Sequence, residues 1–271
     1  MFFDGGMGSM LQRYGMKPGE ASDMQNLLNG TAVVEVHRQY AQAGADILTA
    51  NTFGAYSIHY DNAGEIIQAA FKHLREAITL SGGKGKLMAH DMGPTGRVLQ
   101  PYGDMPHDEC QEIFLQSAKA GAKAGADLIL VETMIDLQEM KAAVQAAKST
   151  GLPVIASMTF EKNGRTIMGT DIPEMAKAME AQKVSAIGMN CGLGPELYKQ
   201  LLPRLAAITN LPILVQPNAG LPEIIDGQAH YNMDPATFAK TMSQMNQATL
   251  LGGCCGTTPD HIKEMIKRCS Q

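Results

Sequence analysis

The sequence of 271 residues has no tryptophan, only 5% aromatic residues and no excess of basic residues. Its formal net charge is −5, which argues against a broad surface for nucleic acid or anionic membranes, because such surfaces need a basic excess. No apolar run approaches the roughly 18 residues that indicate a membrane-spanning helix. We therefore expect neither nucleic acid nor a membrane as a partner.

The N-terminus lacks the basic segment and the apolar core of a signal peptide, so a cytoplasmic location is the default expectation. No Pro/Ser-rich linker or charge run divides the chain, and we expect one domain over residues 1–271. The five cysteines form an odd set, which argues against a disulfide framework and favours metal-binding or catalytic thiols.

Eight short apolar runs alternate with longer helical patterns along the chain. The expected strands are residues 2–4, 46–51, 86–91, 127–132, 153–159, 186–190, 212–216 and 248–252. Dividing the chain by eight gives about 34 residues per unit, which suits one strand, one helix and two loops. The sequence therefore predicts an α/β fold, a single (β/α)8 TIM barrel, with extra loop in its three longest units, which come first.

Helix boundaries are marked by residues of known capping preference. Asp171, Asp234 and Thr258 stand just before a proline, as N-caps do, and Gly44 and Gly125 follow helical segments, as C-terminal glycines do. An open doubly wound sheet is less favoured, because no well-placed Gly-x-Gly-x-x-Gly follows the first expected strand.

In a β/α barrel the active site lies at the carboxyl ends of the strands. The residues at these expected ends are Asp4, Asn51, Asp91, Glu132, Asn190 with Cys191, Asn218, and Cys254 with Cys255. Three of the five cysteines fall in this set, and they meet only if the barrel closes.

The sharpest feature is the segment Gly252-Gly253-Cys254-Cys255-Gly256. Neighbouring side chains in a strand point to opposite faces, so both cysteines can bind one ion only if the backbone turns there, which glycine permits. Together with Cys191, they offer three thiolates, the pattern of a zinc site with one open position. Two buried small side chains and a redox pair are the alternative interpretations.

A zinc ion with three thiolate ligands carries a net charge of −1 and is a weak Lewis acid. It is better suited to binding a substrate thiol as a fourth thiolate at neutral pH, because metal binding favours the deprotonated ligand. The predicted chemistry is attack by that sulfur on an electrophile, without a general base at the sulfur.

Two carboxylates indicate a charged substrate. Asp4 and Glu132 are expected to face the barrel mouth, where they could hold a primary ammonium group, and the backbone of Gly5 to Ser9 could bind a carboxylate. A helix cap, a salt bridge or a glycosidase-like acid/base pair are the other interpretations of these carboxylates. His90 and Asp91 are interpreted as structural, since adjacent strand residues point apart.

Several segments together resemble the zinc-dependent homocysteine S-methyltransferase family. Within that family they most resemble the homocysteine-binding domain of cobalamin-dependent methionine synthase. The segments are Asp4-Gly5-Gly6-Met7-Gly8, Thr49-Ala50-Asn51-Thr52-Phe53, Gly93-Pro94-Thr95-Gly96, Val131-Glu132-Thr133, Met189-Asn190-Cys191 and Gly252-Gly253-Cys254-Cys255-Gly256. The resemblance implies a (β/α)8 barrel, zinc on Cys191, Cys254 and Cys255, and amino-acid contacts from Asp4 and Glu132.

The function that we expect is transfer of a methyl group to the homocysteine thiolate, giving methionine. Eight β/α units use up the chain, so the donor is expected from outside it, and a methylated corrinoid protein acting in trans is favoured. A small sulfonium or betaine-type donor is the first alternative. A non-catalytic subunit that binds homocysteine and zinc within a larger methyltransferase complex is the second.

Overall fold

A computed structural model describes residues 1–225 and 228–270 of the chain. The strands are β1 (Ile47–Thr49), β2 (Leu87–Met92), β3 (Leu128–Met134), β4 (Val154–Met158), β5 (Ala186–Cys191), β6 (Ile213–Pro217), β7 (Pro222–Ile225), β8 (Gln228–Tyr231) and β9 (Leu250–Leu251). The helices are α1 (Met7–Gln12), η1 (Ser22–Met24), α2 (Gln25–Leu28), α3 (Gly30–Ala43), α4 (Ala63–Leu80), α5 (His107–Ala124), α6 (Leu137–Lys148), α7 (Ile172–Ala181), α8 (Pro195–Ala206), α9 (Pro235–Met242) and α10 (Pro259–Cys269).

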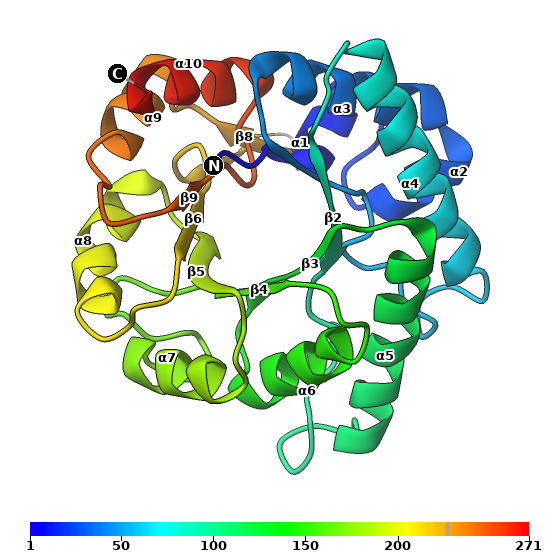
Figure 1. Cartoon of the computed structure of the whole chain (residues 1–271), viewed down its shortest axis with the longest axis vertical. Helices are drawn as coiled ribbons and strands as arrows, with labels where there is room; N and C mark the ends of the chain where they lie inside the picture. The colour runs from blue at the N-terminus through cyan, green and yellow to red at the C-terminus, as the bar shows by residue number, and fades with distance from the viewer. Residues whose placement is uncertain (226–227, 271) are drawn as a thin grey trace.

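Seven of the described strands form one parallel sheet in the order β1-β2-β3-β4-β5-β6-β9. The N-terminal residues lie between its two edges: Phe2 bridges Leu251 of β9 and Phe3 bridges Ile47 of β1, both in the parallel sense. The strands curve into a ring that the helices surround (Figure 1). The α/β class and the parallel sheet are confirmed, and residues 2–4 contribute two isolated bridges where a full strand was expected.

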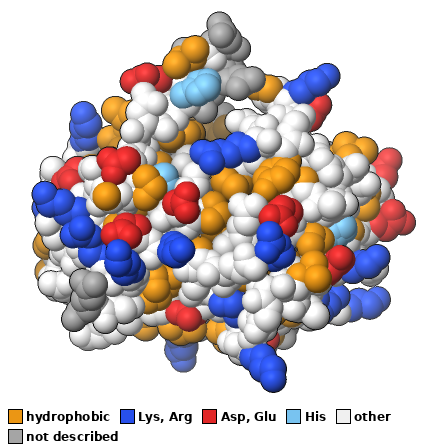
Figure 2. All heavy atoms as spheres, turned by 90° about the horizontal axis from the view of Figure 1, so that it is seen from above, with side chains coloured by type: hydrophobic (Ala, Val, Ile, Leu, Met, Phe, Trp, Pro, Cys, Tyr) orange, Lys and Arg blue, Asp and Glu red, His pale blue; other side chains and the backbone are white. Residues whose placement is uncertain are grey.

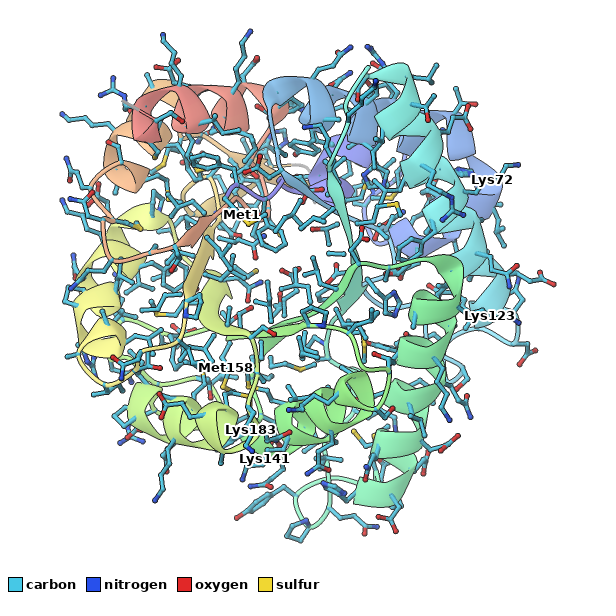
Figure 3. All side chains as sticks on the ribbon, viewed as in Figure 1. Met1, Lys72, Lys123, Lys141, Met158 and Lys183 are labelled. Carbon is cyan, nitrogen blue, oxygen red and sulfur yellow. The ribbon has the colours of Figure 1, made fainter. Side chains whose placement is uncertain are left out.

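Two layers of core hold the ring together. Side chains that alternate along the strands, such as Ile47, Ala89, Leu130 and Leu214, fill its interior, where they form a cluster of their own. The residues between them point outward and pack against the helices in a second, larger cluster. Side chains occupy the inside of the ring, and Lys72 and Lys123 lie on the outer surface (Figure 3). The strands are buried on both faces because both layers are apolar.

The expected helix boundaries are found at their marked residues. Helix α3 ends at Gly44 and α5 at Gly125, each in the left-handed conformation with φ of 106° and 99°. Asp171 and Asp234 accept hydrogen bonds from backbone N–H groups in the first turns of α7 and α9. Thr258 caps α10 in a reciprocal arrangement with His261, three residues further on. The helix boundaries therefore follow the capping preferences of these residues.

Two features of the loops differ from the expectation. Residues 222–225 and 228–231 pair as two antiparallel strands, β7 with β8, which the alternation of strands and helices did not predict. The first unit holds helices α1, η1 and α2 rather than only extra loop. Acidic and basic side chains are interspersed on the face shown in Figure 2, in line with the absence of a basic surface. Among the described residues, no helix combines the length and apolarity needed to cross a bilayer.

Candidate metal and substrate site

The backbone turns sharply just beyond β9. Cys254 donates its N–H to the Pro217 carbonyl, and Thr257 closes a turn by donating its N–H to the Cys254 carbonyl at 3.1 Å. Gly256 has a φ of +78°, a conformation that glycine adopts without strain and that is typical of this turn position. The turn places the Sγ atoms of Cys254 and Cys255 on the same side, 3.9 Å apart.

The third cysteine enters from the end of β5. Cys191 has a φ of +62°, which is strained for a residue with a side chain, so the surrounding structure must hold it. The Tyr198 hydroxyl does so by donating to the carbonyls of Asn190 and Cys191 at 2.7 and 3.0 Å. As a result the Sγ atoms of Cys191, Cys254 and Cys255 all lie within 4.8 Å of one another.

The pKa values of the clustered thiols shift in different directions. Hydrogen bonds to the sulfurs of Cys191 and Cys255, together with burial, raise the pKa of the Cys254 thiol. Hydrogen bonds that Cys255 receives from the other two thiols lower its pKa. A bound divalent cation would stabilise all three groups as thiolates.

Asp4 is positioned by β1 and lies next to the cysteine turn. Its two carboxylate oxygens accept hydrogen bonds from the Thr49 N–H and the Thr49 hydroxyl, both at 2.8 Å. Its backbone carbonyl accepts from the Gly253 N–H, which connects it to the cysteine turn. Burial raises the pKa of Asp4 to about 7, although the Thr49 hydrogen bonds oppose this rise.

Glu132, in β3, is held by Asn190. The Asn190 amide donates to Glu132 Oε2 at 3.2 Å, and its Oδ1 accepts from the Thr133 N–H and the Ser157 hydroxyl. Burial raises the pKa of Glu132 to about 8, and the nearby charges of Cys191 and Asp4 add to the rise. A positive group in the cavity would lower the pKa of both Asp4 and Glu132, because it would stabilise their charged forms.

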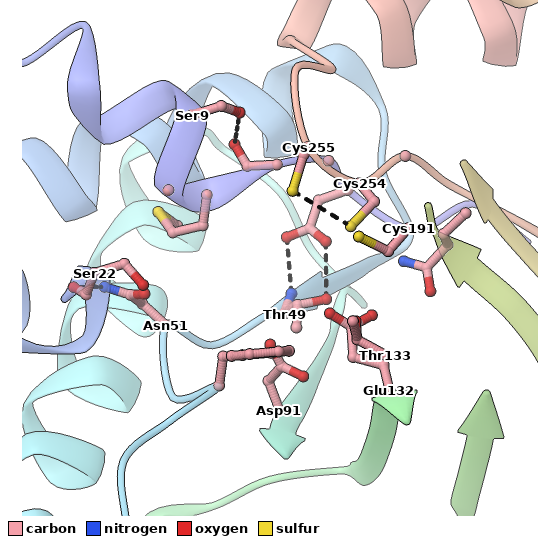
Figure 4. A pocket seen from close by; sticks show the side chains of 18 of the residues that line it. Ser9, Ser22, Thr49, Asn51, Asp91, Glu132, Thr133, Cys191, Cys254 and Cys255 are labelled. Atoms are coloured by element: carbon pink, nitrogen blue, oxygen red, sulfur yellow. Dashed lines mark hydrogen bonds between the residues drawn. The ribbon is translucent and has the colours of Figure 1, made fainter. Parts of the chain in front are cut away.

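All the site residues predicted from the sequence line a single cavity of about 240 Å³. These residues are Asp4, Gly5, Ser9, Glu132, Cys191, Cys254 and Cys255. Figure 4 shows the cysteine sulfurs close together at one side, with Glu132 and Asp91 facing the same space. The cavity is large enough for a small amino acid and too small for a macrocyclic cofactor.

Gly5 and Ser9 shape the wall next to the cysteine turn. A side chain at Gly5 would overlap the Thr257 hydroxyl and the Tyr40 ring, so only glycine fits there. The Ser9 hydroxyl accepts the Gly256 N–H at 3.1 Å, and the Gly6 N–H donates to the Thr257 hydroxyl. The Gly6 N–H is therefore not free for a substrate carboxylate, which narrows the predicted carboxylate site to the other backbone N–H groups of this segment.

The structure separates His90 from Asp91 and adds two tyrosines that the sequence analysis did not name. His90 points away from the cavity and contacts Ser117, whereas Asp91 lines the cavity, as expected from its place at a strand end. Tyr198 holds the Cys191 backbone, and Tyr231 of β8 packs against Gly256. The alternation along β2 was the available signal for Asp91, whereas no local signal marks the tyrosines.

The fold is a parallel α/β ring, and three cysteines meet at the ends of its strands. These features are typical of a protein that binds a metal ion through thiolates. The chain belongs to the homocysteine S-methyltransferase family, whose model matches residues 1–269. The family resemblance found in the sequence is thereby confirmed.

Known relatives agree with this placement. The methionine synthase of Mycobacterium leprae (strain TN) is 33% identical over 100% of this chain. The methionine synthase of Mycobacterium tuberculosis (strain ATCC 25618 / H37Rv) is 33% identical over 98% of it. The chain spans 24% of the length of each of these relatives. The crystal structure of the homocysteine methyltransferase MmuM from Escherichia coli, in its metallated form, superposes with a TM-score of 0.84 at 23% identity, covering 99% of this chain and 96% of that one. This match supports the fold.

Proposed function

We propose that the protein transfers a methyl group to the thiolate of homocysteine, giving methionine, in a zinc-dependent reaction. The observation that carries this proposal is the meeting of the three cysteines with Asp4 and Glu132 in one small cavity. We also propose that residues 1–271 form one domain, a (β/α)8 TIM barrel in which residues 2–4 stand in the place of the first strand. The bridges of Phe2 and Phe3 to β9 and β1 support that architecture.

The cysteine cluster fits zinc by its chemistry. Its three sulfurs converge within 4.8 Å, and no fourth protein ligand belongs to the cluster among the described residues, which leaves one position for a substrate. Zn²⁺ bound by Cys191, Cys254 and Cys255 would hold the homocysteine sulfur as a thiolate at neutral pH. The Tyr198 hydroxyl and the turn at Gly256 keep the three sulfurs in place for this role.

The amino-acid end of homocysteine is assigned to the carboxylates beside the cysteine cluster. Asp4 and Glu132 accept the ammonium group, and Thr49 and Asn190 orient these carboxylates by hydrogen bonds. The backbone from Gly5 to Ser9 lies beside them and is assigned to the substrate carboxylate. Binding both ends fixes the sulfur beneath the mouth of the cavity, where it can attack a methyl carbon in line.

The donor is assigned to a methylated corrinoid protein that acts in trans. A cavity of about 240 Å³ filled by homocysteine leaves no room for a corrinoid, so such a donor would approach from above the mouth. The loops after β2 and β4 leave the same ends of the strands as the cavity residues, and they expose apolar side chains, among them Tyr102 at 87% and Ile167 at 74% exposure. Tyr102 and Met168 line the same surface groove, which is suited to a protein partner.

Methionine formation from homocysteine with a panel of donors tests the proposal. The panel is a methylated corrinoid protein, free methylcobalamin, S-methylmethionine, S-adenosylmethionine and betaine. We expect turnover with the corrinoid donors. Turnover with a sulfonium or betaine alone would select the small-donor alternative, and homocysteine binding without turnover on any donor would indicate a non-catalytic binding subunit.

The apolar rim gives a sharper test of the donor. Replacing Tyr102 and Ile167 by serine is expected to lower turnover with a methylated corrinoid protein by about 10-fold, because exposed apolar anchors contribute strongly to docking. Turnover with free methylcobalamin should not change. Ile208→Ser is the matched control, because Ile208 is 43% exposed at the opposite end of the strands. Equal losses with both donors would contradict docking at this rim.

A further inference from the structure

Asp91 places a third carboxylate in the cavity. Ala89 of β2 faces the interior of the ring, so Asp91, two residues later, points to the same side and lies at the cavity wall. Its side chain is only 7% exposed, and its Oδ1 has no hydrogen-bond partner. A buried acceptor without a donor is costly, so its retention indicates a ligand that supplies one.

The other buried carboxylates of the region are satisfied by protein donors. Asp4 accepts from Thr49, and Glu139 accepts from the Thr95 N–H and hydroxyl. Within residues 1–225 and 228–270, Asp91 Oδ1 is the only buried carboxylate oxygen that lacks a partner. The missing donor must therefore come from something that enters the cavity.

The charge of the cavity identifies that donor as cationic. Its described lining contains Asp4, Asp91 and Glu132 but no lysine, arginine or histidine. Burial raises the pKa of Asp91 well above its ordinary value, and the charges of Glu132, Asp23 and Asp4 add to the rise.

A bare metal ion does not fit between the carboxylates, because the only described group of three ligating side chains within 4.8 Å is the cysteine cluster. A polyatomic cation suits the wider spacing, and its charge would draw the carboxylates inward by removing their mutual repulsion.

We infer that Asp91 accepts a hydrogen bond from the ammonium group of the substrate and selects thiols that carry a primary amine. This inference rests on the proposed function and extends it. A primary ammonium group has three N–H donors, and Asp4, Glu132 and Asp91 offer one carboxylate each from three strand ends. A thiol without the amine would leave all three carboxylates buried and uncompensated, which is a strong basis for rejecting it.

The test compares two ligands that differ only in the amine, L-homocysteine and 4-mercaptobutanoate, by calorimetry on the zinc-loaded protein. In Asp91→Asn, we expect homocysteine to bind about 10- to 100-fold more weakly, as for loss of one hydrogen bond to a charged group. Affinity for 4-mercaptobutanoate should not fall and should rise if anything, because one uncompensated carboxylate has been removed, and zinc content should be unchanged. The melting temperature of the ligand-free variant should rise, because a buried carboxylate without a partner has been removed.

A matched control is Asp127→Asn, at the opposite end of β3, where the carboxylate accepts the Met88 N–H far from the cavity. It should leave the preference for homocysteine intact. Unchanged homocysteine affinity in Asp91→Asn, or equal losses for both ligands, would overturn the role of Asp91 while leaving the proposed function standing. Failure of the wild-type protein to bind homocysteine would overturn both.

Discussion

Cys254→Ser is expected to abolish stoichiometric zinc binding and to lower methionine formation by at least about 100-fold. Changes in residues that only support metal ligands cost roughly 10- to 100-fold, so loss of a ligand should cost at least as much. The physical reason is that serine cannot replace the sulfur that lies 3.9 Å from Cys255 Sγ and within 4.8 Å of Cys191 Sγ. Metal analysis of the purified, zinc-loaded protein and a single assay with the working donor measure both effects.

The same substitution in a helix provides the control. Cys269 lies in α10, outside the cluster, and Cys269→Ser should retain full zinc content and activity. Wild-type protein that holds less than one zinc per chain after loading would contradict the metal assignment. Unchanged zinc content in Cys254→Ser would contradict it equally.

Glu132→Gln should raise the KM for homocysteine by about 10- to 100-fold, the effect of losing one charge-assisted hydrogen bond to the ammonium group. The substitution keeps the shape and leaves an oxygen that can accept the Asn190 amide, so the cavity should stay intact. Zinc content should therefore be that of the wild type, which separates this effect from that of the cysteines. Steady-state kinetics over a range of homocysteine concentrations provide the measurement.

Glu161→Gln, an exposed position in the loop after β4, is the matched control and should leave the KM unchanged. If the KM of Glu132→Gln also stays at the wild-type value, the ammonium group is bound elsewhere. A fall in zinc content with Glu132→Gln would instead point to disruption of the Asn190 network beside Cys191.

Much of the fold was predictable because it depends on local patterns. The buried strands are short apolar runs, and the helices of the later units begin at Asp171, Asp234 and Thr258, residues whose side chains satisfy free backbone N–H groups. The antiparallel pair β7 and β8 was missed because it interrupts the alternation of strand and helix on which the prediction depended. The helices after Asp4 were missed for a related reason, since α1 and α2 are too short to show a clear periodicity.

The site was predictable where it follows from strand direction. Parallel strands bring their carboxyl ends together, so Asp4, Glu132 and the three cysteines were expected at one mouth, and they line one cavity. What could not be predicted are contacts between residues far apart in the sequence. The Asn190 amide that holds Glu132 and the Ser9 hydroxyl that holds the cysteine turn depend on side-chain geometry across the ring.

The bridges of Phe2 to Leu251 and Phe3 to Ile47 also bear on the order of assembly during synthesis. The Phe2 bridge joins residue 2 to β9, the last of the described strands, and such long-range contacts form late because closing a long loop is entropically costly. Asp4 and the cysteine turn lie directly beside this contact, linked by the Gly253 N–H and the Asp4 carbonyl. The site is therefore complete only once these distant segments have joined, and any ligand that binds the finished site would stabilise this step by binding its product.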